Sequence, residues 1–325
     1  MANSFGLIRK IFLMGICGCF LLPFIGFPQV ATPSLDPSEA VLMPAASGWR
    51  ESTSVSVSYK EGNGTRTLQD EQIYQFDSSG ASANLAFQSD NLFMEINLDQ
   101  ITTNVKLDQY QNGSINLGKE DGRLHLALIG DDFVSIGLGA RSFRTRDYVD
   151  ATYDSESTSR MSTIGAISVK TMDVFFLGLG FERVKEESTY EANLTWNNIV
   201  SGVAMKLGDP GGTRFRFEYD LEFSSEVEVD EQEDIQGNRH PKTSVSTASV
   251  EIMFNGLLFS AKNIATLIEV DTSLVNEVKK TMTQGGVLWK PEQGLSLGFY
   301  FKNYETVSFY EDDDSIFQIN LGYIF

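Results

Sequence analysis

The last nine residues, Phe317 to Phe325, constrain the fold of this 325-residue chain more than any other segment. Large apolar residues occupy every second position: Phe317, Ile319, Leu321, Tyr323 and Phe325. Gln318, Asn320 and Gly322 lie between them, and Ile324 is the one exception. Because successive side chains of a strand point to opposite faces, the segment predicts a strand with one apolar face and one mostly polar face.

The same alternation recurs along the chain. It is clearest over 134–140, 175–181, 215–223 and 295–301, where the second face carries glycine or charged residues. The pattern predicts an all-β fold, a transmembrane antiparallel up-and-down β-barrel. The terminal segment also resembles the C-terminal signal of bacterial outer-membrane proteins. That resemblance implies that its five alternating apolar residues are read by the barrel assembly machinery.

Connection lengths predict the topology of this barrel. About fourteen strands are expected, at 51–60, 79–88, 92–107, 115–129, 133–146, 159–170, 174–186, 189–207, 213–228, 242–254, 257–269, 281–290, 295–306 and 315–325. Short turns alternate with longer polar loops near 61–78, 147–158, 229–241, 270–280 and 307–314, as in barrels with short periplasmic turns and longer outer loops. Both ends of the barrel then lie in the periplasm. Alternation is weaker over 101–121 and 263–280, and twelve or sixteen strands remain compatible with it. Leu274, Val275 and Val278 also fit a helical turn in an outer loop.

The N-terminus has the organisation of a secretory signal peptide. Arg9 and Lys10 precede an apolar run, and cleavage is predicted after Ala31. Both cysteines lie in this leader, and the residues around them loosely resemble a lipobox, so lipidation at Cys19 is the alternative. The predicted organisation is a signal peptide over 1–31, a periplasmic segment or short plug over 32–50, and an outer-membrane barrel over 51–325.

Composition and motifs exclude several functions. A net charge of -19 argues against nucleic acid as a partner. The chain has two histidines, His125 and His240, and neither precedes a serine by two residues as in outer-membrane lipases. Gly294-Leu295-Ser296-Leu297-Gly298 has the Gly-x-Ser-x-Gly spacing, but it lies in an alternating strand segment and not at a strand-to-helix turn, so we expect no enzyme, no cofactor and no metal centre. Acidic runs at 226–234 and 311–314 predict solvated outer loops, with weak divalent-cation binding between loops or lipopolysaccharide phosphates as the alternative.

Charged residues on the inward face of the predicted strands form a candidate lumen patch. Its members are Lys206, Arg214, Arg216, Glu218, Asp220 and Glu251. We expect Lys206 to face Arg214 across the tight 209–212 turn, and Glu251 to pair with Arg216. Two interpretations remain open: a cross-strand salt-bridge ladder that fills a closed interior, or a charged constriction that filters solutes.

The three tryptophans are expected at the membrane interfaces. Trp196 is placed at the outer interface by its distance along the strand from Leu207, and this placement requires a bulge near Asn197 and Asn198. Trp49 and Trp289 lie at predicted periplasmic strand ends.

The segment before the first strand, residues 38–50, contains an apolar run followed by Pro44-Ala45-Ala46. It resembles the N-terminal region of the long-chain fatty-acid transporter (FadL-like) family, although Met43 stands where that family usually has Asn. The resemblance implies fourteen strands and a periplasmic N-terminal plug. We therefore predict a channel or transporter for small or hydrophobic solutes in the bacterial outer membrane, among outer-membrane lipids and lipopolysaccharide. The alternative is a non-conducting structural or surface-interaction barrel with acidic extracellular loops.

Overall fold

The computed structural model describes residues 29–36, 39, 41, 43–68, 71–107, 114–130, 132–149, 157–172, 174–188, 193–208, 212–224, 228–229, 242–269, 277–307 and 311–325. Its strands are β1 (Ser54–Leu68), β2 (Glu71–Ser89), β3 (Leu92–Leu107), β4 (Ser114–Gly130), β5 (Val134–Val149), β6 (Ser157–Thr171), β7 (Phe175–Ser188), β8 (Leu194–Leu207), β9 (Arg214–Ser224), β10 (Glu228–Val229), β11 (Lys242–Phe254), β12 (Leu257–Glu269), β13 (Glu277–Trp289), β14 (Gly294–Val307) and β15 (Glu311–Ile324). Among the described residues, no helix is long and apolar enough to cross a membrane.

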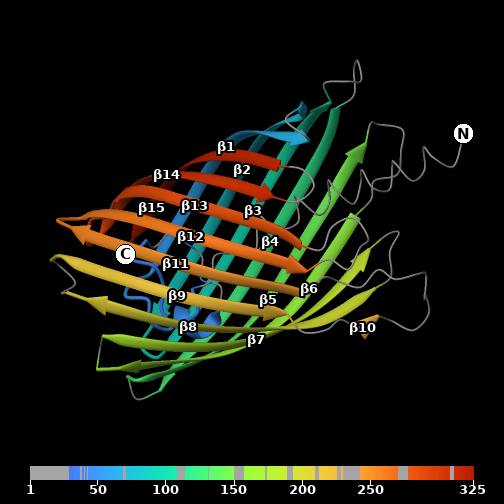
Figure 1. Ribbon diagram of the computed structural model, residues 1–325. Coiled ribbons are helices and arrows are strands. Elements are labelled where there is room, and N and C mark those ends of the chain that lie inside the picture. The colour runs from blue at the N-terminus through green and yellow to red at the C-terminus, as the bar shows by residue number, and fades with distance from the viewer. Residues whose placement is uncertain are drawn as a thin grey trace, which may run out of the picture.

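These strands form one closed antiparallel barrel (Figure 1). The first strand pairs with the last from Ser54↔Ile324 to Thr67↔Glu311, and this seam closes the sheet. β10 pairs with β8 beyond the end of β9, where Ser224 opposes Asn198 and Glu228 opposes Thr195, so the register of the two pairings differs by one residue. β9 and β10 therefore count as one, and the barrel has the fourteen strands that the sequence predicts.

The barrel has two distinct ends. We call the end where β1 begins and β15 finishes the turn end, and the opposite one the loop end. Turns at the turn end place Asp90, Asp132, Met172 and Asn255 at positive φ, and Gly208, Gly256 and Gly294 as well. These positions match the turns predicted from sequence, because short polar residues and glycine tolerate that backbone conformation best.

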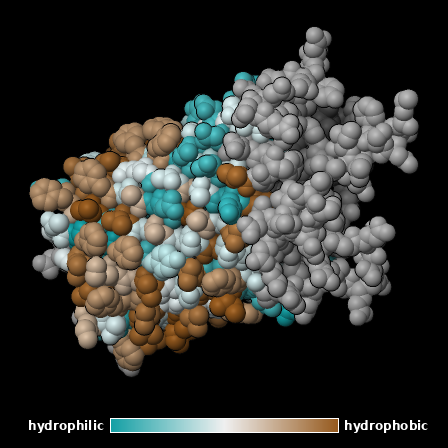
Figure 2. Space-filling model, in the orientation of Figure 1, coloured by the Kyte–Doolittle hydropathy of each residue, from teal (hydrophilic) through white to brown (hydrophobic). Residues whose placement is uncertain are grey.

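Side chains alternate across the wall as a barrel in lipid requires. Large apolar residues are exposed on the outside, including the terminal set at Phe317, Leu321, Tyr323 and Phe325. Figure 2 shows apolar side chains spread over the visible flank of the barrel. The inward positions are mostly polar, charged or glycine. An apolar exterior around a polar interior matches the alternation of transmembrane barrels.

The N-terminal segment lies inside the barrel, near the turn end (Figure 1). We call its described residues 29–36, 39, 41 and 43–50 the plug, which begins three residues before the boundary at 32 predicted from sequence; cleavage after Ala31 would remove residues 29–31 and their contacts. It contains one short helix, α2 (Pro44–Ser47), which starts with proline and contacts β3, β4, β5 and β6. Proline suits the first helical turn because its missing N–H is not needed there.

Three sequence expectations for the loop end are wrong. The expected 61–78 loop is mostly strand, since β1 runs to Leu68 and β2 begins at Glu71. The acidic residues Glu311 to Asp314 belong to β15 and pair with β1, where Arg66 opposes Asp312. Val278 lies in β13 and not in a helical turn, while Leu274 and Val275 lie outside the described residues. Polar strands that rise above the apolar band carry no hydrophobic alternation, so their pattern resembles that of loops.

Candidate functional site inside the barrel

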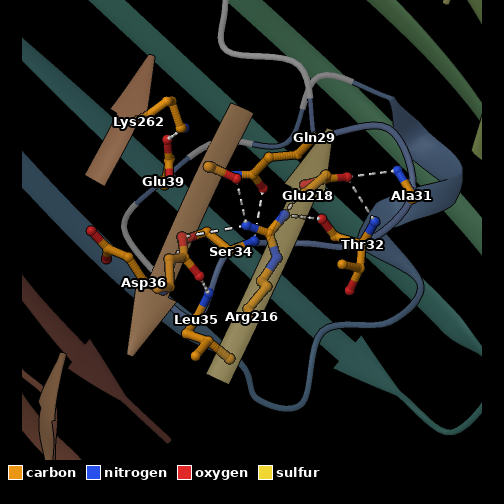
Figure 3. A network of polar contacts seen from close by, with 12 residues as sticks. Gln29, Ala31, Thr32, Ser34, Leu35, Asp36, Glu39, Arg216, Glu218 and Lys262 are labelled. Carbon is orange, nitrogen blue, oxygen red and sulfur yellow. Dashed lines mark hydrogen bonds and ion pairs between the residues drawn. The ribbon is translucent and has the colours of Figure 1, made fainter. Parts of the chain in front are cut away.

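A buried charge cluster on β9 and β11 holds the first part of the plug (Figure 3). Arg216 forms ion pairs with Glu218 and Glu251, and it donates a 2.8 Å hydrogen bond to the carbonyl of Thr32. Glu218 accepts the backbone N–H of Ala31 at 2.9 Å. These groups are almost fully buried, so each charge depends on fixed partners.

The neighbouring contacts extend this cluster towards β12 and β14. Glu251 accepts the Leu35 N–H at 2.7 Å and a hydrogen bond from the Ser34 hydroxyl. The Tyr300 hydroxyl donates to Asp36, and Lys262 forms an ion pair with Glu39 (Figure 3 shows this pair).

The charge state of Glu39 follows from its surroundings. Burial raises the pKa of the Glu39 carboxyl, but the Lys262 ammonium and the more distant Arg216 charge outweigh burial and hold the pKa below its usual value. Glu39 therefore stays ionised and paired.

A second anchor, Glu95 on β3, holds the later part of the plug. Its carboxylate accepts the Val41 N–H at 3.3 Å and the Ser47 hydroxyl at 3.1 Å. It also accepts the Arg50 guanidinium at 3.0 Å and the Asn84 amide at 3.1 Å. Four donors on one buried carboxylate connect both ends of the α2 region to the wall, and Arg50 and Glu95 are a fully buried pair.

A third anchor joins the plug to the turn end of the wall. Glu51, next to the plug, forms ion pairs with Lys206 and Arg214. Burial raises the pKa of Glu51, but these two cations outweigh it and lower the pKa to about 2. The first and third anchors lie on the neighbouring strands β8, β9 and β11, whereas Glu95 lies on β3, so the plug is held at two separate parts of the wall.

Inward glycines on β5, β7 and β8 make room for the plug. A Cβ atom at Gly178 would lie 2.2 Å from the Val30 carbonyl oxygen, and one at Gly137 would lie 2.4 Å from the Ala45 nitrogen. A Cβ at Gly180 would lie 2.3 Å from the Met43 sulfur. Glycine permits this close approach of backbone to wall, so the glycines in the alternating segments form a seat for the plug.

The interior changes character towards the loop end. Buried apolar side chains point inward there from many strands: Phe76, Ile101, Val105, Leu117, Phe143, Val184, Leu194, Trp196, Val245, Ile264, Ile268, Met282 and Ile316. Val184, Leu194 and Trp196 pack together, and Val245, Ile264 and Met282 form a second cluster. We call this set the apolar lining.

Paired charges form a belt near mid-height of the barrel, and one further pair, Arg160 with Glu186, lies at the level of the apolar lining. Asp121 binds Arg123 at 2.7 Å and Arg141 at 2.9 Å, and Lys60 binds Asp99 at 2.6 Å. Arg160 pairs with Glu186, and its guanidinium also lies 5.5 Å from the Trp196 ring centroid and 5.7 Å from that of Phe143. Cations at this distance over a ring are attracted to it, so this arginine contacts the apolar lining.

The structure places the six residues of the predicted lumen patch on the inner face of the barrel. Glu251 lies opposite Arg216, as expected. Lys206 lies opposite Arg216 and not Arg214, because the turn is centred further along the chain, with Leu207 paired to Phe215. Lys206 and Arg214 still meet, through Glu51. Sequence reasoning missed Glu51, Glu95 and Lys262, because their partners come from the plug or from distant strands.

Two of the three tryptophan placements are wrong. Trp196 points inward and is 5% exposed, because β8 keeps an unbroken register with β7 and the expected bulge is absent. Trp49 belongs to the plug, packs edge-on against Phe176 and donates to the Ser168 hydroxyl at 2.8 Å. Trp289 is exposed at the turn end of β13.

Comparison with known proteins shows similarity of fold. No protein-family model matches the chain, and no curated protein matches it in sequence. The Ralstonia pickettii toluene transporter TbuX matches with a TM-score of 0.60 at 9% identity, over 92% of this chain and 98% of that one. The Pseudomonas putida toluene transporter TodX matches at 0.60 and 8%, over 92% and 96%. A Pseudomonas aeruginosa FadL homologue matches at 0.59 and 10%, over 92% and 99%. The predicted resemblance to the FadL-like barrel is confirmed for the fold.

Proposed function

We propose that this protein is a bacterial outer-membrane channel for hydrophobic solutes, with the turn end in the periplasm and the loop end outside. The apolar lining carries the proposal. Inward Phe143, Trp196 and Met282 would be unfavourable in a water-filled pore, because they would expose apolar surface to water. Such a lining suits a solute that is itself apolar. The fold neighbours, which include two toluene transporters, support the same class of solute.

The plug closes the periplasmic side of the proposed path. Its anchors, centred on Glu95, Arg216 and Glu51, fix it to two parts of the wall near the turn end. Neighbouring strands are hydrogen-bonded in continuous register over the described wall, apart from a one-residue difference between the β9 and β10 pairings with β8 and a shift between Arg66 and Thr67. A solute that enters from outside therefore meets the plug, and the plug must move before the solute can reach the periplasm.

The test compares two kinds of permeation. Purified protein in liposomes should speed the entry of a monoaromatic hydrocarbon, with toluene as the probe, over protein-free liposomes. In planar bilayers the same protein should show little steady ion conductance, because the plug and the paired charges fill the periplasmic side.

Two outcomes contradict the proposal. Large ion conductance without faster hydrocarbon entry would indicate a water-filled pore. Neither activity, with the barrel correctly folded, would favour the alternative of a non-conducting structural or surface-interaction barrel.

A further inference from the structure

Basic residues gather on the outside of the barrel at the loop end of β5 and β7. Arg144 and Arg146 lie two residues apart on β5, and Arg183 and Lys185 lie two residues apart on β7. Residues i and i+2 of a strand share a face and lie about 7 Å apart. All four point away from the interior, where Phe143 and Val184 are buried. We call these four residues the outer basic patch.

The strand between these two pairs is uncharged on the same face. β6 places Ser159 opposite Arg144, and Met161 opposite Lys185. Thr163 lies opposite Arg183. Two neighbouring strand spacings put β5 and β7 about 10 Å apart. The patch therefore consists of one pair of cations on β5 and one pair on β7. Small polar residues and one exposed methionine on β6 separate the two pairs.

Part of this charge has no ion-pair partner among the described residues. Lys185 pairs with Glu187 at 2.9 Å, and Arg146 lies 4.0 Å from Glu120. Arg144 and Arg183 make no ion pair with any residue that the structure describes. Guanidinium groups suit phosphate because their planar fork can donate two parallel hydrogen bonds.

The patch also has a defined position on the barrel. Directly below it on the lipid-facing surface lie Leu138, Leu177 and Leu179, all more than half exposed. The other side of the wall, at β14, β15 and β1, carries outward acidic residues at the loop end, where Glu305 faces Asp313 across neighbouring strands. In a chain of net charge -19, this distribution concentrates outward positive charge on one flank.

We propose that the outer basic patch binds the phosphorylated headgroup of an outer-leaflet glycolipid such as lipopolysaccharide. This inference rests on the membrane orientation in the proposed function. In that orientation the four cations lie where the apolar band ends on the outside, which is the level of outer-leaflet headgroups. Headgroup phosphates would meet Arg144 and Arg183, while the acyl chains contact the leucines below.

The test uses the purified full barrel and two matched double variants. Arg144→Ser with Arg183→Ser removes the unpaired cations, and Lys106→Ser with Lys279→Ser removes two outward cations from β3 and β13. Binding of lipopolysaccharide, of its enzymatically dephosphorylated form and of inorganic phosphate would be measured by native mass spectrometry. Near-surface cations contribute about 1 kcal/mol each, so the patch variant, which lacks two of them, should bind intact glycolipid roughly thirtyfold more weakly than the wild type. The control should stay within about twofold of the wild type.

Each other result overturns the inference. Equal affinity for the dephosphorylated glycolipid would show that the phosphates are not recognised. Equal weakening by both double variants would show a non-specific charge effect, and tight binding of inorganic phosphate alone would indicate a free-anion site. Heat-modifiable migration of both variants shows that they are folded barrels. Toluene entry tests the proposed function separately, since the patch faces away from the interior.

Discussion

The turn-end half and the loop-end half of the barrel interior present different side chains from the same strands. Near the turn end, many inward positions are glycine, polar or charged, beside apolar residues such as Phe93, Phe176 and Leu258, and the charges of the three anchors contact the plug or a fixed partner. Near the loop end, apolar and aromatic residues are more frequent at the inward positions of the same strands, although Arg66, Lys119 and Glu186 are also buried there. A buried charge is stable only with a partner, so the buried charges near the turn end require their contacts with the plug. The apolar lining requires no fixed partner and is suited to a transient apolar ligand.

The largest effect should come from Glu95→Ala. It leaves the buried Arg50 guanidinium without its carboxylate, and breaking such a pair costs about 3–5 kcal/mol. The α2 region should then leave its seat. A reporter cysteine at Ala46, which is fully buried, should react with a water-soluble maleimide roughly tenfold faster or more.

A matched control is Asp77→Asn, which breaks an exposed pair with Lys106 on the outer face. Exposed pairs contribute at most about 1 kcal/mol, so labelling at position 46 should not change. If Glu95→Ala also left labelling unchanged, the plug would be held by its apolar and glycine contacts alone.

The next effect should come from filling the glycine seat. Gly178→Val places side-chain atoms where the Val30 carbonyl now lies, and overpacking of this kind costs about 1–3 kcal/mol. Gly165→Val on β6 is the control, because no atom lies within 4 Å of its Cβ position. Denaturant midpoints in detergent should separate the two variants. Equal midpoints would mean that the plug shifts away from β7 without cost.

A change in the apolar lining should affect transport more than plug retention. Trp196→Ala with Phe143→Ala removes two inward rings, and we expect toluene entry into liposomes to change several-fold while labelling at position 46 stays constant. Trp289→Ala, on the outer surface, is the control. Increased labelling in the double variant would show that the two halves are coupled and not independent.

The smallest effect should be the acid sensitivity of Glu51. Its pKa is depressed to about 2 by Lys206 and Arg214. Its pairing therefore stabilises the folded state above the unfolded pKa of about 4.3 and is lost as pH falls through the folded value. Melting temperatures of the wild type and Glu51→Gln should differ near pH 6, and the gap should narrow below about pH 4 and close near pH 2. A constant gap down to pH 2 would show that the two cations do not depress this pKa.

The sequence predicts the wall well because the membrane imposes a strict pattern on it. The outward residues of β15, and turn residues such as Asp90 and Asn255, locate the strands at the turn end to within a few residues. Above the apolar band this constraint disappears. The polar run from Gly62 to Gln75 was therefore expected as a loop, although most of it is strand.

The candidate site was only partly predictable for a different reason. Arg216 and Glu251 lie on neighbouring strands, and strand parity is enough to bring them together. Glu95 and Arg50 meet only because the plug folds back into the barrel, and no periodicity encodes that contact. The inward glycines were a signal that could have been used, since Gly178 and Gly180 leave a space on the inner face that another segment must fill.

The seam between β1 and β15 determines the order of events during assembly. It joins the first and last strands, and the N–H of Phe325, the final residue, donates to the Thr53 carbonyl at 3.0 Å. Contacts of such high sequence separation form slowly, and the edges of the two strands are prone to aggregation while they remain unpaired. The plug is joined to β1 by only residues 51–53, so it stays close to the curling sheet throughout assembly. We therefore expect it to take its seat on β3 and β9 while the sheet is still open, before the seam closes.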